Sequence, residues 1–182
     1  MNKVDRRILK SQEAIKNAVI ELMSEKSFDD ITIQEIADRA NVNRATIYLH
    51  YLDKYDLLDK LIDEHINKLK EISEWACEME WLDAIPVFFE YFETNYLFFS
   101  TMLASKGGAP SFRNKFLEYV IEGYKGELYK TNGKNEGLSE EVIVKFAGNA
   151  YVGVLESWLK DGMPSPPHVI AKELGILLER IL

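Results

Sequence analysis

Apolar residues recur at intervals of three and four along most of the chain, which is the spacing of one face of an α-helix. In the first run, pairs of apolar residues begin at Ala14, Ala18 and Leu22, and they predict a helix over about residues 6–26. Short polar stretches separate this run from the next ones. The alternating pattern of a β-strand does not compete with it anywhere. The pattern predicts an all-α fold.

The remaining runs are also helical, with short breaks between them. A second helix is expected to begin at Thr32, because a threonine followed three residues later by Glu35 has the order of a capping box. Asn43 is expected to cap a third helix. This third helix spans about residues 44–51. Further helices are predicted over about residues 53–75, 83–104, 111–129 and 139–160, and a last one runs from the break DGMPSPP to Leu182.

Residues 31–58, ITIQEIADRANVNRATIYLHYLDKYDLL, contain a turn only a few residues long at Asn41-Val42-Asn43. Two helices joined by a tight turn and braced by a third form a helix-turn-helix, whose second helix fits the major groove of DNA. The residues expected to hold the helices together are Ile36, Ala37, Ala40, Val42, Ile47 and Tyr51. The outward face of the second helix would carry Arg44, Ala45, Thr46, Tyr48, Leu49 and His50.

Several of these outward side chains suit contacts with DNA. Arg44 can bond a guanine base through two hydrogen bonds, and Thr46, Tyr48 and His50 can bond phosphate oxygens. Lys54, at the start of the next predicted helix, would add a phosphate contact. Helix pairs with a tight turn also occur in proteins that never touch DNA, where Tyr48 or His50 would be ordinary packed surface residues.

The same segment resembles the DNA-binding signature of the TetR family of bacterial transcriptional regulators. That signature is threonine, three residues, Ile-Ala, two residues, Ala-Gly-Val-Ser, then Thr-x-Tyr-x-His-Phe and Lys-x-x-Leu. The matching positions in this chain, at the same spacing and without gaps, are Thr32, Ile36, Ala37, Ala40, Val42, Thr46, Tyr48, His50, Lys54 and Leu57. The resemblance implies that Arg44, Ala45 and Leu49 face bases, with phosphates held by Thr32, Thr46, Tyr48, His50 and Lys54. Asn43 completes the candidate DNA-binding set.

Three positions depart from the family pattern. Asn41 replaces the usual turn glycine, but asparagine tolerates the left-handed conformation that such a turn uses. Asn43 replaces serine and can still cap the following helix. Ser27 stands where the family often has a glycine after its first helix, so we expect that turn to close differently. None of these changes removes a group that could contact DNA.

Residues 142–182 resemble one branch of the family's regulatory domains, with a small-residue helix, a tryptophan segment, a proline break and a closing apolar helix. Small residues at 147, 148, 150 and 153 would lie roughly along one helix face and let another helix approach. The resemblance implies that the last two helices of each subunit pair across a two-fold axis in a homodimer. The alternative is that they pack only within one subunit.

Aromatic residues are concentrated over residues 75–129. Cavities lined by aromatic side chains and a few polar groups commonly hold small ligands, and the resemblance implies such a cavity here. The candidate ligand contacts are Phe88, Phe92, Tyr96, Phe99, Phe116, Tyr119, Tyr151 and Trp158. The alternative is that these rings form a filled core.

Composition and charge narrow the function further. The formal net charge is −8, but residues 1–56 hold nine basic against ten acidic residues, so most of the acidity lies in the remainder. A local contact with DNA is therefore compatible with the acidic total. The three histidines are far apart in sequence, the single cysteine has no histidine near it, and no glycine-rich phosphate loop is recognisable. We expect no enzyme activity, metal or cofactor.

These observations predict a regulator with a helix-turn-helix DNA-binding domain at residues 1–52 and a helical regulatory and dimerisation domain at residues 53–182. The expected partners are a double-stranded palindromic operator, a second copy of the chain and an unknown small apolar or amphipathic effector that releases a repressor from DNA. The alternative is a coactivator of the same fold controlled by a protein partner. The charged N-terminus and the lack of a long apolar run predict a cytoplasmic protein with no membrane contact.

Overall fold

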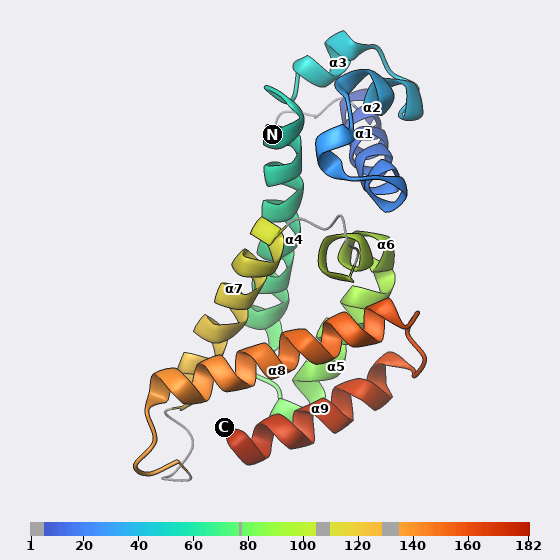
Figure 1. The fold of residues 1–182 in the computed structure, drawn as a ribbon. Coiled ribbons are helices and arrows are strands. Elements are labelled where there is room, and N and C mark those ends of the chain that lie inside the picture. Colours follow the sequence, from blue (N-terminus) through green and yellow to red (C-terminus); the bar gives the residue numbers. More distant parts are fainter. Residues whose placement is uncertain (1–5, 77, 105–109, 129–134) are drawn as a thin grey trace.

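The computed structural model describes residues 6–76, 78–104, 110–128 and 135–182, and within these ranges it contains helices and no strand (Figure 1). The N-terminal elements are α1 (Arg6–Glu25), the 3-10 helix η1 (Phe28–Asp30), α2 (Ile33–Arg39), α3 (Arg44–Tyr48) and α4 (Lys54–Ala76). The later elements are α5 (Trp81–Thr94), α6 (Tyr96–Phe99), the π-helical segment η2 (Ser100–Ala104), α7 (Pro110–Leu128), α8 (Glu140–Lys160) and α9 (Pro167–Ile181). The predicted all-α fold is confirmed.

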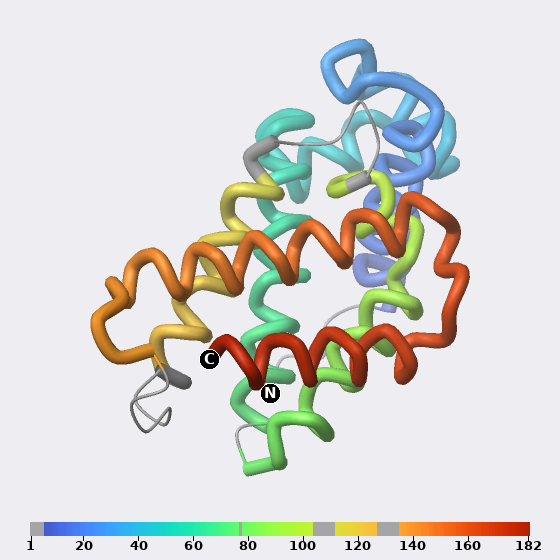
Figure 2. The backbone as a smooth tube through the Cα atoms, turned by 60° about the horizontal axis from the view of Figure 1, so that its bottom comes forward, coloured from blue at the N-terminus to red at the C-terminus, as the bar shows by residue number. Residues whose placement is uncertain are grey.

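The helices form a small head and a larger body joined by α4. The head holds α1, α2 and α3, and α4 runs from it into the body (Figure 1). In the body α5 packs along α9 and α7 packs along α8. Figure 1 shows α8 and α9 at the end of the body opposite α3, and in Figure 2 the two helices cross the side of the body that is turned forward. The last two helices are therefore distant from the helix predicted to read DNA.

Local capping explains why the short helices of the head begin where they do. The Thr32 hydroxyl accepts the backbone N–H of Glu35, and the Glu35 carboxylate accepts the backbone N–H of Thr32, which is the predicted capping box. The Asn43 side chain accepts the N–H of Ala45 and so caps α3. Asn41 has a φ of 52°, the left-handed conformation expected of this turn. Ser27 has a φ of −60°, so its turn needs no glycine.

The predicted helix over residues 83–104 is divided in the structure. Asn95 separates α5 from α6 with φ −110° and ψ 32°, and its side-chain amide donates to the carbonyl of Tyr91 at 2.9 Å. The same carbonyl also accepts the backbone N–H of Asn95 at 3.1 Å, so both donors of Asn95 close the end of α5. The hydrophobic pattern continues across Asn95, which is why sequence periodicity could not locate the break.

The small residues of α8 lie on two faces, so the expected single face is wrong. Ala147 and Gly148 are buried within the subunit. A Cβ on Gly148 would come within 2.8 Å of Ile121 Cγ1 on α7, so this glycine allows α7 and α8 to approach closely. A Cβ on Gly153 would have no atom within 4 Å. A turn of 100° per residue separates residues 148 and 153 by about 140°, which accounts for the difference.

Candidate DNA interface and candidate effector cavity

The short helix α3 lies at the outer end of the head with one side packed and the other exposed (Figure 1). Ile47 is fully buried and anchors the helix, whereas Tyr48 is 50% exposed and Leu49 is 79% exposed. Arg44 and Ala45 are exposed as well. These are residues expected to meet DNA, and the structure brings them together on one surface.

The other predicted DNA contacts are less free. Thr46 and His50 are half-buried, and the His50 ring packs edge-on against Tyr51. The Thr32 hydroxyl is exposed, but it bonds Glu35 within the capping box. A phosphate contact by Thr32 stays a prediction, since its hydroxyl already has a structural task.

Lys54 has a different position from the one expected. Its ammonium donates to the backbone carbonyls of Phe28, Asp29 and Ile31 at 3.0, 2.8 and 2.9 Å. It also lies over the Phe28 ring, 5.0 Å from the centroid. With all three ammonium protons directed at carbonyls, Lys54 joins the start of α4 to η1 and does not offer a free cation to a phosphate. A phosphate contact by Lys54 stays a prediction, and the structure adds this structural role.

Additional bonds fix the segment that follows α3 to the beginning of α4. The Asp53 carboxylate accepts the N–H groups of Tyr55 and Asp56, and the Asp56 carboxylate accepts the N–H of Leu52. Lys60 donates to the carbonyl of His50 at 3.1 Å and to Asp56 at 2.8 Å. A rotation or shift of α4 would therefore carry α3 with it.

Two of these residues were not singled out from the sequence. Leu52 is 83% exposed in the bend between α3 and α4, beside the candidate DNA surface. An isolated leucine in a helical pattern gives no sign of this exposure. The bond from Lys60 to the carbonyl of His50 could have been suspected, because the carbonyls at the end of a helix need donors and a nearby lysine can supply one.

A cavity of about 330 Å³, here called the aromatic cavity, opens between α4, α5, α7 and α8. Five of the residues predicted to contact a ligand line this cavity: Phe88, Phe92, Phe116, Tyr119 and Tyr151. Its volume lies at the lower end of the range for sites that bind small molecules. The aromatic region is thus neither a filled core throughout nor a large open chamber.

The structure does not bring the other three predicted ligand contacts to this cavity. Phe99 is fully buried and packs edge-on against Phe92 and Phe98. The Tyr96 hydroxyl donates to the carbonyl of Leu159, and the Trp158 indole donates to that of Ser165. Trp81 and Tyr124 line the cavity instead, although aromatic content alone could not separate lining residues from core residues.

Burial changes the titration of the cavity's tyrosines. It raises the pKa of Tyr119 to about 12 and the pKa values of Tyr124 and Tyr151 further above the usual range. All three phenols therefore stay protonated at neutral pH. The Tyr119 hydroxyl donates to the carbonyl of Leu69 at 2.9 Å.

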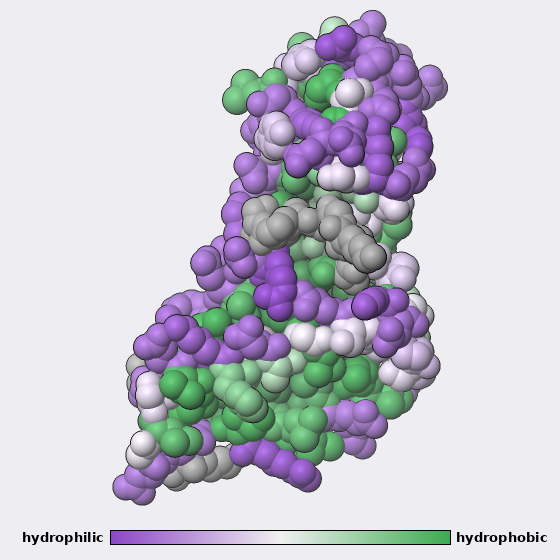
Figure 3. Space-filling view, in the orientation of Figure 1, coloured by the Kyte–Doolittle hydropathy of each residue, from purple (hydrophilic) through white to green (hydrophobic). Residues whose placement is uncertain are grey.

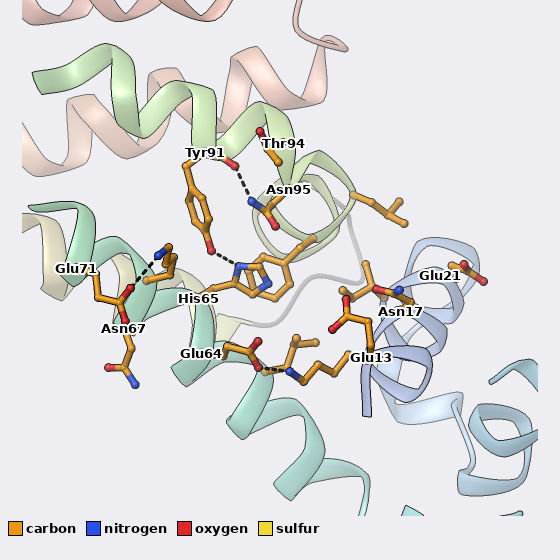
Figure 4. A pocket seen from close by; sticks show the side chains of 16 residues that line it. Glu13, Asn17, Glu21, Glu64, His65, Asn67, Glu71, Tyr91, Thr94 and Asn95 are labelled. Atoms are coloured by element: carbon orange, nitrogen blue, oxygen red, sulfur yellow. Dashed lines mark hydrogen bonds and ion pairs between the residues drawn. The ribbon is translucent and has the colours of Figure 1, made fainter. Parts of the chain in front are cut away.

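A second, more polar cavity of about 540 Å³ lies where α1 meets α4, α5 and α6, and is here called the junction cavity (Figure 4). His65 of α4 bonds the Tyr91 hydroxyl at 2.8 Å and stacks on Phe98 with ring centroids 3.7 Å apart. Burial lowers the pKa of His65 to about 4, so the ring is neutral at physiological pH. Lys16 of α1 pairs with Glu64 of α4 across the same cavity.

The outward side of α8 and α9 is apolar. Figure 3 shows this surface over the part of the body that the two helices cover. Val142, Phe146 and Leu177 are 64, 62 and 53% exposed. Together with Ala150 and Gly153 they form what is here called the α8–α9 patch. Large exposed apolar patches mark surfaces that bind other proteins or membranes. No helix in the described ranges is long and apolar enough to cross a membrane.

Two family models match the chain. Residues 15–61 match "Bacterial regulatory proteins, tetR family" and residues 79–180 match "Transcriptional regulator C-terminal region". An uncharacterised HTH-type transcriptional regulator of Bacillus subtilis, YxbF, is 38% identical over 60 residues. That match spans 32% of this chain but only 16% of YxbF.

Solved structures share the fold over nearly the whole chain. A TetR transcriptional regulator from Streptococcus agalactiae superposes with a TM-score of 0.72 and 23% identity, covering 97% of each chain. The regulator FadR from Bacillus subtilis, solved in complex with stearoyl-CoA, has a TM-score of 0.71 and 17% identity, covering 93% of this chain and 98% of FadR. At these identities the likeness establishes the architecture and not the ligand.

Proposed function

The chain belongs to the TetR family of bacterial transcriptional regulators, and we propose that it is a homodimeric repressor that leaves a palindromic operator when a small effector binds. The observation that carries the proposal is the exposed face of α3, with Arg44 free at its start and Ile47 anchored beneath it. Members of the matched families regulate transcription and are not enzymes.

The proposed DNA contacts are those on the exposed side of the head. Arg44, Ala45 and Leu49 would face bases, and Thr46, Tyr48 and His50 would meet phosphates. Asn43 would act through its cap on α3, and Lys54 through its bonds to η1. We place the boundary between the two functional domains at residues 52 and 53, with the first turn of α4 bonded to the head.

The α8–α9 patch supports a homodimer. A two-fold axis would lay this patch on its own copy, so that Phe146 and Leu177 are buried by their equivalents. An isologous contact of this kind also suits the operator, because two α3 helices related by a two-fold axis read inverted half-sites in successive major grooves.

The aromatic cavity supports a small effector rather than a protein partner, which would need no internal space. The cavity is lined in part by α4, and α4 is bonded to the segment that follows α3. A ligand that prefers one tilt of α4 would therefore change the separation of the two heads. Only such a preference releases DNA, because a ligand with equal affinity for both tilts shifts nothing.

Selection of bound fragments from random duplex DNA tests the proposal. The wild-type chain should enrich one sequence made of two inverted half-sites, and the enriched duplex should bind two subunits. Enrichment of no sequence, or of a single half-site by a monomer, would contradict it.

A further inference from the structure

Two buried phenol groups in the aromatic cavity have no hydrogen-bond partner in the described part of the chain. Tyr124 and Tyr151 are each 7% exposed, and their ring centroids lie 6.3 Å apart in an edge-to-face arrangement. The hydroxyl of Tyr119, on the same cavity, is by contrast bonded to the carbonyl of Leu69. A hydroxyl sealed from solvent without a partner would be costly, so two unbonded hydroxyls at this depth call for an account of what lies beside them.

Both hydroxyls belong to residues that line the aromatic cavity. Among the described residues, no side-chain oxygen that is sealed from solvent lacks a partner. The Tyr124 and Tyr151 hydroxyls must therefore keep some accessible surface. Both rings are almost wholly buried and both residues line the aromatic cavity, so the space beside their hydroxyls is the cavity itself. Each hydroxyl can donate one hydrogen bond to a molecule held there.

The charges around this space select against anions. Among the described residues that line the cavity there is no lysine, arginine or histidine, and the one charged side chain is Glu80. Glu80 is the exposed residue before the first turn of α5. A carboxylate or phosphate brought to the phenol pair would lose its hydration and meet no cation, at a large cost in free energy.

From this geometry we infer that the cavity takes an effector whose buried end is an uncharged hydrogen-bond acceptor, such as a ketone, held by the hydroxyls of Tyr124 and Tyr151. The cavity rejects the carboxylate of the same shape. The rest of the ligand packs against the rings of Trp81 and Phe88, and Glu80 disfavours a negative charge at the mouth. The inference rests on the proposed function, since it describes the effector of that regulator.

Three naphthalene probes of one framework test it: 6-propionyl-2-(dimethylamino)naphthalene, the corresponding 6-carboxylate, and 2-(dimethylamino)naphthalene, which lacks the carbonyl acceptor. Calorimetry on the full chain at neutral pH gives each affinity. The ketone should bind at least about tenfold more tightly than the carboxylate, because an unpaired charge loses more on burial than a neutral acceptor does.

Variants locate the acceptor site. Tyr124→Phe and Tyr151→Phe keep the rings and should each weaken the ketone about three- to tenfold, which is the range for one neutral hydrogen bond. The same changes should leave the probe without an acceptor unaltered. Tyr119→Phe is the matched control, because its hydroxyl is already bonded to Leu69. It should not change the ratio between the affinities for the ketone and for 2-(dimethylamino)naphthalene. Glu80→Gln should improve only the carboxylate.

Equal affinity for ketone and carboxylate, an unchanged ketone affinity in both Tyr124→Phe and Tyr151→Phe, or no binding of any probe would each overturn the inference. Operator selection by the wild-type chain reports separately on the proposed function. A chain that selects an operator but ignores these probes keeps its place as a regulator and loses this effector class. A chain that binds the ketone through the phenol pair but selects no DNA keeps this ligand site and loses the proposed function.

Discussion

The ammonium of Lys54 lies 2.8 Å from the backbone carbonyl oxygen of Asp29, which joins the first turn of α4 to the connection between α1 and α2. Two further carbonyls, those of Phe28 and Ile31, accept from the same ammonium. Hydrogen bonds from a charged donor are stronger than neutral ones. The start of α4 is therefore bonded to the connection between α1 and α2, and under the proposed function a tilt of α4 would move the head with it.

Lys54→Met should lower the free energy of unfolding by about 1–3 kcal/mol, because two half-buried carbonyls and one exposed carbonyl lose a charged donor. Methionine keeps most of the apolar stem, so lost packing contributes little. Urea titration followed by circular dichroism measures the change. Lys68→Met, which removes an exposed cation of α4 paired with Glu71, is the control and should change stability by well under 1 kcal/mol. Equal stability of the two variants would refute the structural role of Lys54.

Arg44→Ala should weaken binding to the selected operator by about 1–3 kcal/mol and relax the base preference at one position of each half-site. Arg44 is exposed at the start of α3 and can reach a base edge. Fluorescence anisotropy with the operator and with random duplexes measures both effects. Arg180→Ala removes an exposed cation from α9 and should leave the ratio between specific and random affinity unchanged. A similar loss on both kinds of DNA for Arg44→Ala would show that it contacts only the phosphates.

Phe146→Glu should convert the dimer to monomers and reduce operator affinity at least about tenfold, since a buried apolar contact is replaced by repelling charges on the two-fold axis. Light scattering after gel filtration gives the mass. Trp75→Glu alters a side chain of α4 with a matched exposure of 65%, against 62% for Phe146, and should leave the mass unchanged. A dimer that survives Phe146→Glu would place the interface elsewhere.

Gly148→Ala should destabilise the chain by about 1–3 kcal/mol, because the new methyl group would lie 2.8 Å from Ile121 Cγ1. Gly126→Ala in α7 has open space around it and should stabilise its helix by up to about 1 kcal/mol through reduced backbone entropy in the unfolded chain. Thermal unfolding of the two variants provides the comparison. A stabilising Gly148→Ala would mean that α7 and α8 are less closely packed than the distance indicates.

Because of His65, the free energy of unfolding should decrease as the pH is lowered from about 6.5 to about 4. Burial lowers its pKa to about 4 in the folded chain, whereas the unfolded chain binds the proton near 6.5. The full stability is therefore present above pH 6.5, and each unit below it removes up to about 1.4 kcal/mol. His65→Gln should flatten the unfolding free energy between pH 7 and pH 5. The bond to Lys26 lowers the pKa of Glu35 to about 2, so Glu35 also costs stability, but only below about pH 4.5. The range from pH 7 to pH 5 therefore reports on His65 without this contribution. An identical slope in the variant would contradict the assignment.

Local sequence signals predicted the head well because its short helices are set by local bonds. The capping box at Thr32, the cap at Asn43 and the left-handed Asn41 each depend on residues within a few positions of one another. The bonds of Lys54 to η1 could not be predicted, because its partners lie more than twenty residues away and no periodicity reports such a contact.

In the body, too, the sequence did not show which residues pack together. Aromatic content indicated where a cavity could form, but not that Phe99 is core while Tyr124 lines the space. The two faces of α8 could have been separated by helical geometry alone, since residues 148 and 153 differ by more than a third of a turn. Which of the two faces the subunit itself covers depends on α7, which is distant in sequence.

Hydroxyl-radical footprinting of the wild-type chain on its selected operator tests the central claim most directly. Two α3 helices held by the α8–α9 contact should protect backbone segments in two successive major grooves on one face of the duplex, their centres about 10 base pairs or a small multiple apart. One protected segment, or continuous protection around the duplex, would contradict the account.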